Sequence, residues 1–271
     1  MVSSASISCM TIAALVAVVL PVGLFFGLRK RLGLRVVPML VGAAVFIVFA
    51  VILEGQIVHP LVLRPDENGV IGLLATNPAA FVAYGALAAG VFEETGRLVG
   101  FTLLKQRFAG VRTAVSYGIG HGGMEVILVL GLGMVSNITL AMLINTGASE
   151  QVFAGLPADQ AAAIVQALTQ TPPQMFLLGI VERIFALIVQ LSLSVLVWVA
   201  VTHADRRWLF PLAIVLHALV DVPPACAQAG LLSVTWVEII LVPSALVLGA
   251  YALWWLRRCL GEERLAVDAA H

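Results

Sequence analysis

The sequence predicts an all-α protein: a polytopic membrane helix bundle of about seven transmembrane helices, forming one integral membrane domain over residues 1–271. Two observations on composition predict this class. Hydrophobic residues make up 61% of the chain, while Asp, Glu, Lys and Arg make up only 11%, against about 25% in a soluble domain. In addition, the apolar residues form runs of about 20, the length of a membrane-crossing helix. A soluble globule of this size could not cover its surface with so few charges.

The balance of charge excludes other classes of protein. The chain has 15 basic and 15 acidic residues, which gives a formal net charge of zero. Nucleic-acid binding needs a surplus of Lys and Arg, so we expect no nucleic-acid partner. Disordered chains have low hydrophobicity, whereas the mean hydropathy here is +1.05. We therefore expect the lipid bilayer to be the main environment of the chain.

The apolar runs predict where the helices cross the membrane. The expected spans are residues 8–28, 36–58, 79–104, 113–137, 174–202, 208–222 and 231–256. The fourth could continue as helix to about Asn145. The sixth is short and should end at Pro223-Pro224, with an irregular or re-entrant piece up to Gly230. An amphipathic stretch at 157–169 predicts a short helix at the outer interface.

The distribution of positive charge predicts the orientation of the bundle. Cytoplasmic loops carry an excess of Lys and Arg. Twelve of the 15 basic residues fall on one side of the predicted bundle: Arg29, Lys30, Arg31, Arg35, Lys105, Arg107, Arg112, Arg206, Arg207, Arg257, Arg258 and Arg264. We therefore expect the N-terminus outside, the C-terminus in the cytoplasm, and a multi-pass location in a bacterial cytoplasmic membrane.

Ionisable side chains lie inside four of the expected spans. Such groups are costly in the hydrocarbon region and are by default functional candidates. The third span carries Glu93, Glu94 and Arg97, the fourth His121 and Glu125, the fifth Glu182 and Arg183, and the sixth His217 and Asp221.

The spacing and depth of these groups predict that they share one cavity. Residues four apart lie on one helix face, as His121 and Glu125 do, and as His217 and Asp221 do. At about 1.5 Å per residue, His121 lies roughly 12 Å and His217 roughly 14 Å from the cytoplasmic ends of their spans. Glu93 lies roughly 16 Å from the cytoplasmic end of its own span. Acids and imidazoles from three helices should therefore meet at one level.

This set of residue types is typical of hydrolysis by activated water. A carboxylate can act as general base toward water, and imidazoles can orient that water or stabilise an oxyanion. Zn²⁺ or another divalent metal could assist, and the candidate ligands are His121, Glu125, His217 and Asp221. The zincin motif H-E-x-x-H is absent. Ser116 has no convincing base near it in the sequence, and Asp221 has no facing intramembrane Asp.

Several of the same features have a structural interpretation. Neighbours on a helix do not face each other, so Glu182 and Arg183 should each pair with another span. Glu54 and Glu238 should be interfacial, at outer ends of spans. The glycines of the fourth span allow close helix packing, or leave room for a substrate backbone beside the imidazole; they are Gly118, Gly120, Gly122 and Gly123.

The cysteines predict little. Cys9, Cys226 and Cys259 form no metal-binding spacing in the sequence. Cys9 and Cys226 could both lie on the outer side, and the sequence leaves open whether they are bonded.

Four motifs in order resemble a known group of membrane proteins. EETGR at 93–97, the His in the next span and H-x-x-x-D at 217–221 resemble the intramembrane glutamate proteases of the CAAX-protease and bacteriocin-processing superfamily. Within it, GHGGMEVILV and GIVERIFALIVQLSLSVLVW are most similar to the YhfC family of membrane peptidases. Its relatives include the PrsW proteases and the anterior-pharynx-defective scaffold subunit of gamma-secretase.

The resemblance implies a role for each matching residue. Glu93 would activate water with Glu94 beside it, His121 and His217 would complete the water site, and Asp221 would take the oxyanion-stabilising position. The sequence departs from the pattern at two positions. Arg97 follows the glutamates one residue earlier than in EE-x-x-x-R, and Gln190 stands where the family commonly has a His. The family is usually described as metallo, although a glutamate mechanism needs no metal.

The leading hypothesis is therefore an intramembrane endopeptidase of glutamate or metallo type. Its partner would be a membrane-anchored or lipidated peptide or protein. The alternative is a non-enzymatic scaffold or assembly subunit whose buried His and Glu residues lock helices together. A proton- or ion-coupled transporter is a third possibility, although repeated broken helices, which would indicate one, are absent. Substrate identity, bound metal and oligomeric state are left open.

Overall fold

The computed structural model describes residues 1–67, 69–149 and 153–269, and every regular element in these ranges is helical. In chain order they are α1 (Ser4–Leu32), α2 (Val36–Phe46), the π-helical segment η1 (Ile47–Val58), α3 (His59–Leu63), α4 (Gly72–Thr76), α5 (Pro78–Leu104), α6 (Arg112–Val126), the π-helical segment η2 (Ile127–Leu132), α7 (Gly133–Thr146), α9 (Ala158–Gln170), α10 (Pro173–Thr202), the 3₁₀ turn η3 (Ala204–Arg206), α11 (Leu209–Gln228) and α12 (Val234–Asp268). The predicted all-α class is confirmed.

Within the described ranges, six helices are long and apolar enough to cross a membrane. They are Ser4–Leu32, Val36–Leu63, Arg112–Thr146, Pro173–Thr202, Ala204–Gln228 and Val234–Asp268. The protein is therefore an integral, multi-pass membrane protein. The remaining expected span, 79–104, corresponds to α5, which has the length to cross but carries two glutamates and an arginine. The side of the membrane on which each end lies stays a prediction.

Two span boundaries differ from the expected ones. The prediction that Pro223-Pro224 end the sixth span is wrong, because α11 continues as regular helix to Gln228. Proline removes only its own N–H from the helix, and Ala225 beyond the pair is held by packing against Phe81 and Val82 of α5. The last helix also exceeds its predicted end, since α12 runs on to Asp268.

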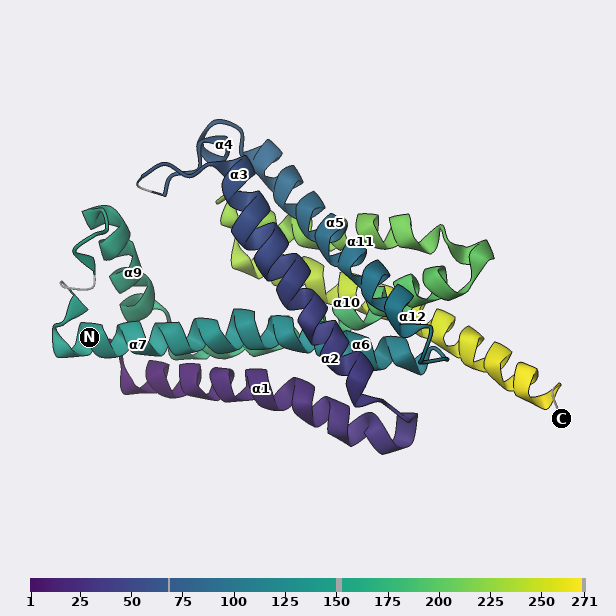
Figure 1. Cartoon of the computed structure of the whole chain (residues 1–271). Helices are drawn as coiled ribbons and strands as arrows, with labels where there is room; N and C mark the ends of the chain where they lie inside the picture. The colour runs from purple at the N-terminus through teal and green to yellow at the C-terminus, as the bar shows by residue number, and fades with distance from the viewer. Residues whose placement is uncertain (68, 150–152, 270–271) are drawn as a thin grey trace.

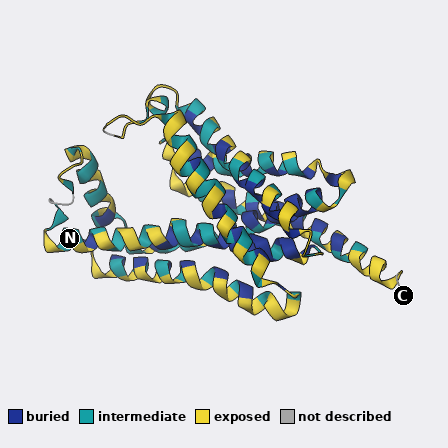
Figure 2. Ribbon diagram, in the orientation of Figure 1, coloured by how far each residue is buried: buried dark blue, intermediate teal, exposed yellow. Residues whose placement is uncertain are grey.

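Helix α10 lies at the centre of the bundle. In its most apolar window 67% of the residues are buried, against 17–33% in the other five candidate spans. Figure 1 shows α1 lying along the continuous helix formed by α6 and α7, while α2 crosses that helix and α5 runs beside the helix formed by α2 and η1. In Figure 2 the buried residues are concentrated where these helices cross. The outward faces carry exposed apolar side chains such as Leu15, Leu103 and Val247, as expected for contact with lipid.

The glycines of α6 are packing positions. A Cβ added to Gly120 would lie 1.8 Å from the backbone oxygen of Met39, and one added to Gly122 would lie 2.7 Å from Cβ of Gln190. No side chain fits at either distance, so glycine is required for α6 to approach α2 and α10 this closely. These two positions face neighbouring helices, so they leave no room for a substrate backbone.

Candidate active site

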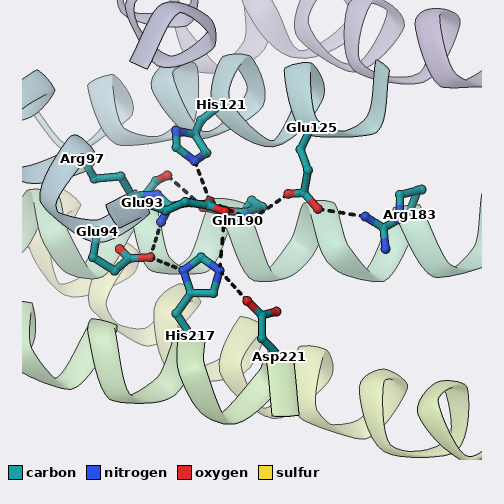
Figure 3. A network of polar contacts seen from close by, with 10 residues as sticks. Glu93, Glu94, Arg97, His121, Glu125, Arg183, Gln190, His217 and Asp221 are labelled. Atoms are coloured by element: carbon teal, nitrogen blue, oxygen red, sulfur yellow. Dashed lines mark hydrogen bonds and ion pairs between the residues drawn. The ribbon is translucent and has the colours of Figure 1, made fainter. Parts of the chain in front are cut away.

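Four helices bring the ionisable residues to one place. Glu93, Glu94 and Arg97 come from α5, His121 and Glu125 from α6, Gln190 and Arg183 from α10, and His217 and Asp221 from α11. Figure 3 shows the Glu93 carboxyl between the imidazole of His121 on one side and that of His217 on the other. The groups that the sequence placed at one depth therefore do meet, and their catalytic roles stay a proposal.

Glu93 is the residue on which the contacts converge. Its Oε2 lies 2.9 Å from His121 Nε2 and accepts a hydrogen bond of 3.3 Å from Gln190 Nε2. Arg97 Nη2 lies 3.5 Å from the same oxygen. The other carboxylate oxygen of Glu93, Oε1, lies 4.0 Å from His217 Nε2, and this distance is too long for a direct hydrogen bond. One oxygen of Glu93 is thus fixed by three helices, and the other faces an imidazole across a short gap.

His217 is held by carboxylates on both of its ring nitrogens. Nδ1 lies 2.6 Å from Glu94 Oε1, and Nε2 lies 3.4 Å from Asp221 Oδ2. Glu94 and His217 are almost wholly buried, whereas the Asp221 side chain is 32% exposed. The ring orientation of His217 is therefore set from α5, and Nε2 is directed toward Glu93 and Asp221.

Arg97 is a wholly buried cation that ties the two glutamates together. Its guanidinium donates hydrogen bonds to Glu94 and to Gln190 Oε1, and lies near Glu93. A buried charge is tolerated when it is paired and hydrogen-bonded. Arg97 stabilises the adjacent carboxylates, even though it stands one residue earlier than in the family pattern.

A second chain of contacts runs from Gln190 toward one end of α10. Gln190 Nε2 donates to Glu125 Oε2 at 2.7 Å, and Arg183 Nη1 donates to Glu125 Oε1 at 2.8 Å. Arg183 does pair with another helix, as expected. The expectation for Glu182 is wrong, because its carboxylate accepts a hydrogen bond from Arg183 on the same helix. The long arginine side chain reaches its sequence neighbour even though the two Cβ atoms point apart.

His121 lies in an aromatic environment with one nitrogen unpaired. Its ring meets Phe46 edge-on at 5.2 Å between centroids and stacks with Tyr117 at 5.8 Å. Nδ1 is buried and has no hydrogen-bond partner among the described residues, and the same holds for Glu94 Oε2 and Arg97 Nε. Unsatisfied buried polar atoms are costly and uncommon, so this cluster is not optimised for stability alone.

Comparison with known proteins assigns the family. The YhfC intramembrane metalloprotease family matches residues 16–242. A protein of Bacillus subtilis (strain 168), described as an uncharacterized membrane protein YhfC, is 36% identical over 259 residues, covering 94% of this chain and 97% of the relative. The chain belongs to the YhfC family. No solved structure matches it.

The name of the YhfC family implies a metal, and the donor types in the site are those that Zn²⁺ prefers. The donor atoms, however, are not gathered around one point. Among the described residues, only His203, Cys259 and Glu262 offer three donor atoms within 4.8 Å of one another. In the candidate active site, Glu125 instead accepts hydrogen bonds from Arg183 and Gln190. As arranged, these residues do not fit a metal ion.

A second buried polar group lies outside the predicted site. Glu54, expected to be interfacial, is buried at 6% exposure. Its Oε1 lies 3.4 Å from His59 Nε2, and His59 Nδ1 lies 2.9 Å from the hydroxyl of Tyr84 on α5. Glu54 belongs to π-helical η1, whose wider turns place side chains where a regular helix would not, and its depth in the membrane stays a prediction. Periodicity assumed for an α-helix could not find this group.

The remaining sequence candidates stay apart from the site. The hydroxyl of Ser116 donates to the backbone oxygen of Arg112 and accepts from the backbone N–H of Arg35. Cys9, Cys226 and Cys259 are all free, so Cys9 and Cys226 are not bonded.

Proposed function

We propose that this YhfC-family protein is an intramembrane endopeptidase that hydrolyses membrane-anchored or lipidated peptides with water activated by Glu93. The observation that carries the proposal is the arrangement of Glu93: one carboxylate oxygen is fixed by His121, and the other faces His217 Nε2 at 4.0 Å. A water bonded to both Glu93 Oε1 and His217 Nε2 would sit about 2.8 Å from each. General bases act at this distance.

The proposed reaction uses only side chains of this chain. Glu93 takes a proton from the water while the water oxygen bonds to the carbonyl carbon of the substrate amide. The π electrons of that carbonyl move to the carbonyl oxygen, which becomes an oxyanion. His217, when doubly protonated, donates from Nδ1 to Glu94. Its single Nε2–H, shared between Asp221 and the water before the reaction, is donated to that oxyanion as it forms. The C–N bond then breaks, and the proton held by Glu93 passes to the leaving nitrogen.

The other residues position this pair. His121 fixes Glu93, and Arg97 neutralises part of the charge of the two glutamates. Asp221 Oδ2 lies 3.4 Å from His217 Nε2, so the role of Asp221 is to orient His217. Glu125, Arg183 and Gln190 support the cluster from the side of α10. No step is assigned to a metal, since the donor atoms do not converge.

One observation favours the alternative of a non-enzymatic scaffold. The acids and imidazoles are bonded directly to one another, as in the contacts of Glu93 with His121 and of Glu94 with His217. Direct pairs of this kind lock helices together without any reaction. The two functions differ in what Glu93→Gln does, because the amide keeps hydrogen-bonding capacity but cannot carry the proton.

The test compares the membrane peptides released by cells that express the chain and by cells that express variants. New peptide termini from membrane-anchored proteins should appear with the unaltered chain and with Asp205→Asn, a control at an exposed carboxylate. They should disappear with Glu93→Gln at an unchanged level of folded protein. Identical termini with Glu93→Gln, or none with any form, would reject the peptidase and leave the scaffold.

A further inference from the structure

A second cluster of donor atoms lies where the loop after α10 meets α12. It contains His203, which follows α10, and Cys259 and Glu262, which share one face of α12. One nitrogen, one sulfur and one carboxylate oxygen of these residues lie within 4.8 Å of one another. These residues are outside the proposed active site and have no part in the proposed reaction. We propose that the cluster is a binding site for a divalent transition-metal ion of the Zn²⁺ type.

The chemistry of the donors selects this class of ion. A thiolate favours soft or borderline metals, an imidazole suits Zn²⁺, and a carboxylate can complete the set. Hard cations such as Mg²⁺ and Ca²⁺ prefer oxygen donors alone and would not use the sulfur. Three protein ligands and a water complete the four-coordinate geometry of Zn²⁺, and binding displaces the proton of the Cys259 thiol into solution.

The geometry needs little adjustment. Ligand atoms around a tetrahedral Zn²⁺ lie roughly 3.5 Å apart, given bonds of about 2.0 to 2.3 Å. His203 Nε2 already lies 3.6 Å from Glu262 Oε2. His203 Nδ1 lies 2.9 Å from the hydroxyl of Thr202, which leaves Nε2 directed at the cluster. An outer partner on the second ring nitrogen is the usual companion of a metal-binding histidine.

Arginine side chains now neutralise Glu262, and Arg258 Nε donates to its Oε1 at 3.1 Å. The guanidinium of Arg206 donates to both oxygens of Glu262, at 2.7 and 3.0 Å, and lies 3.9 Å from Cys259 Sγ. Asp205 is another partner of Arg206, because its Oδ2 lies 3.4 Å from Arg206 Nε. Arg206 and a metal ion therefore compete for Glu262, so removal of the arginine should tighten metal binding.

The cluster is open to the surface of the protein. The side chains of His203 and Glu262 are 31% and 39% exposed, whereas Cys259 is buried beneath them. His203 also lines an open surface pocket of about 480 Å³ together with Lys105 and Glu263. An ion can thus enter from solution, and once bound it would fasten the loop after α10 to α12.

Co²⁺ serves as the spectroscopic probe, added to the metal-stripped, purified full-length protein. A thiolate bound to Co²⁺ gives a charge-transfer absorption in the near ultraviolet. We expect a band that saturates at one ion per chain and is displaced by Zn²⁺. Cys259→Ser should abolish the band, while the matched control Cys226→Ser should keep it. Zn²⁺ should also raise the thermal stability of the unaltered protein, since it binds only the folded state.

Three further variants keep the proposal falsifiable if Cys259→Ser does not fold. His203→Gln alters a partly exposed residue and should weaken binding at least tenfold, and Arg206→Gln should strengthen it. Glu93→Gln should leave the band unchanged, because the proposed active site lies elsewhere. Absence of a stoichiometric band in the unaltered protein would overturn the proposal. So would a band that survives both Cys259→Ser and His203→Gln, or one lost only in Glu93→Gln.

Discussion

His217 Nδ1 lies 2.6 Å from Glu94 Oε1, joining α11 to α5 across 123 residues of sequence. Both side chains are buried in a medium of low dielectric, where Glu94 also accepts a hydrogen bond from Arg97 and His217 Nε2 also faces Asp221. Removing one member of such a buried pair takes away part of the compensation of the other. The pair is thus the clearest place to separate a stabilising role from a catalytic one.

We predict that His217→Ala lowers the free energy of unfolding by about 3 kcal/mol, because Glu94 keeps Arg97 but loses its hydrogen bond with the imidazole in the interior. Glu94→Gln should also destabilise the protein. The double variant should lose at least about 1 kcal/mol less than the sum of the two, as expected for residues in contact. Thermal unfolding in detergent measures all three, and strictly additive losses would contradict the pairing.

Asp221 should tolerate an amide but not an apolar side chain. If it positions His217 by accepting from Nε2, the oxygen of Asp221→Asn can do the same. We therefore predict that Asp221→Asn keeps the release of peptide termini within about tenfold, whereas Asp221→Leu lowers it by about 100-fold or more. Equal losses in the two variants would show that the negative charge itself is required.

Arg97 should be the most sensitive position in the cluster. Its replacement by Gln leaves Glu94 and Glu93 without their cation in the bundle interior, at a cost of about 3 to 5 kcal/mol. Arg64→Gln is the matched control, because Arg64 is exposed and its Nε donates to the backbone oxygen of Leu61. Similar thermal stability of Arg97→Gln and Arg64→Gln would be inconsistent with a buried Arg97 guanidinium that pairs with the two glutamates.

Much of the fold follows from the sequence, because the bilayer limits the choice. Apolar runs of membrane-crossing length permit only helices, and six of the seven expected spans fall on helices that meet that requirement. Pro223 and Pro224 show the limit of local signals. Their helix-breaking tendency is outweighed by the packing of Ala225 on α5, a contact between distant segments.

The sequence predicts which residues form the candidate site better than it predicts how those residues contact one another. Equal depth on separate helices placed Glu93, His121 and His217 together, and the structure has them so. The bridging position of Gln190 between Arg97 and Glu125 depends on how α10 is rotated. Rotation is set by packing at positions such as Gly122, which helical periodicity alone does not determine.

The donor cluster where the loop after α10 meets α12 gave no signal in the sequence. His203 lies 56 residues before Cys259, and the cysteines have no metal-binding spacing. Only the continuation of α12 beyond its predicted end at 256 brings Cys259 and Glu262 beside the loop after α10. Arg257 and Arg258 follow the apolar run directly, so hydropathy alone predicts that the span ends at 256.

A last prediction compares two glycines on the continuous helix formed by α6, η2 and α7. A Cβ at Gly120 would lie 1.8 Å from the backbone oxygen of Met39, whereas one at Gly133 would meet nothing within 4 Å. Gly120→Ala should therefore force α2 away from α6 and cost at least about 2 kcal/mol, because backbone atoms cannot rotate aside. Gly133→Ala should be neutral or slightly stabilising, since alanine favours helix.

Because Phe46, which contacts His121, is carried on α2, Gly120→Ala should also impair peptide release. Thermal unfolding of the two variants checks the first expectation, and equal stability would mean that the helices are not in such close contact.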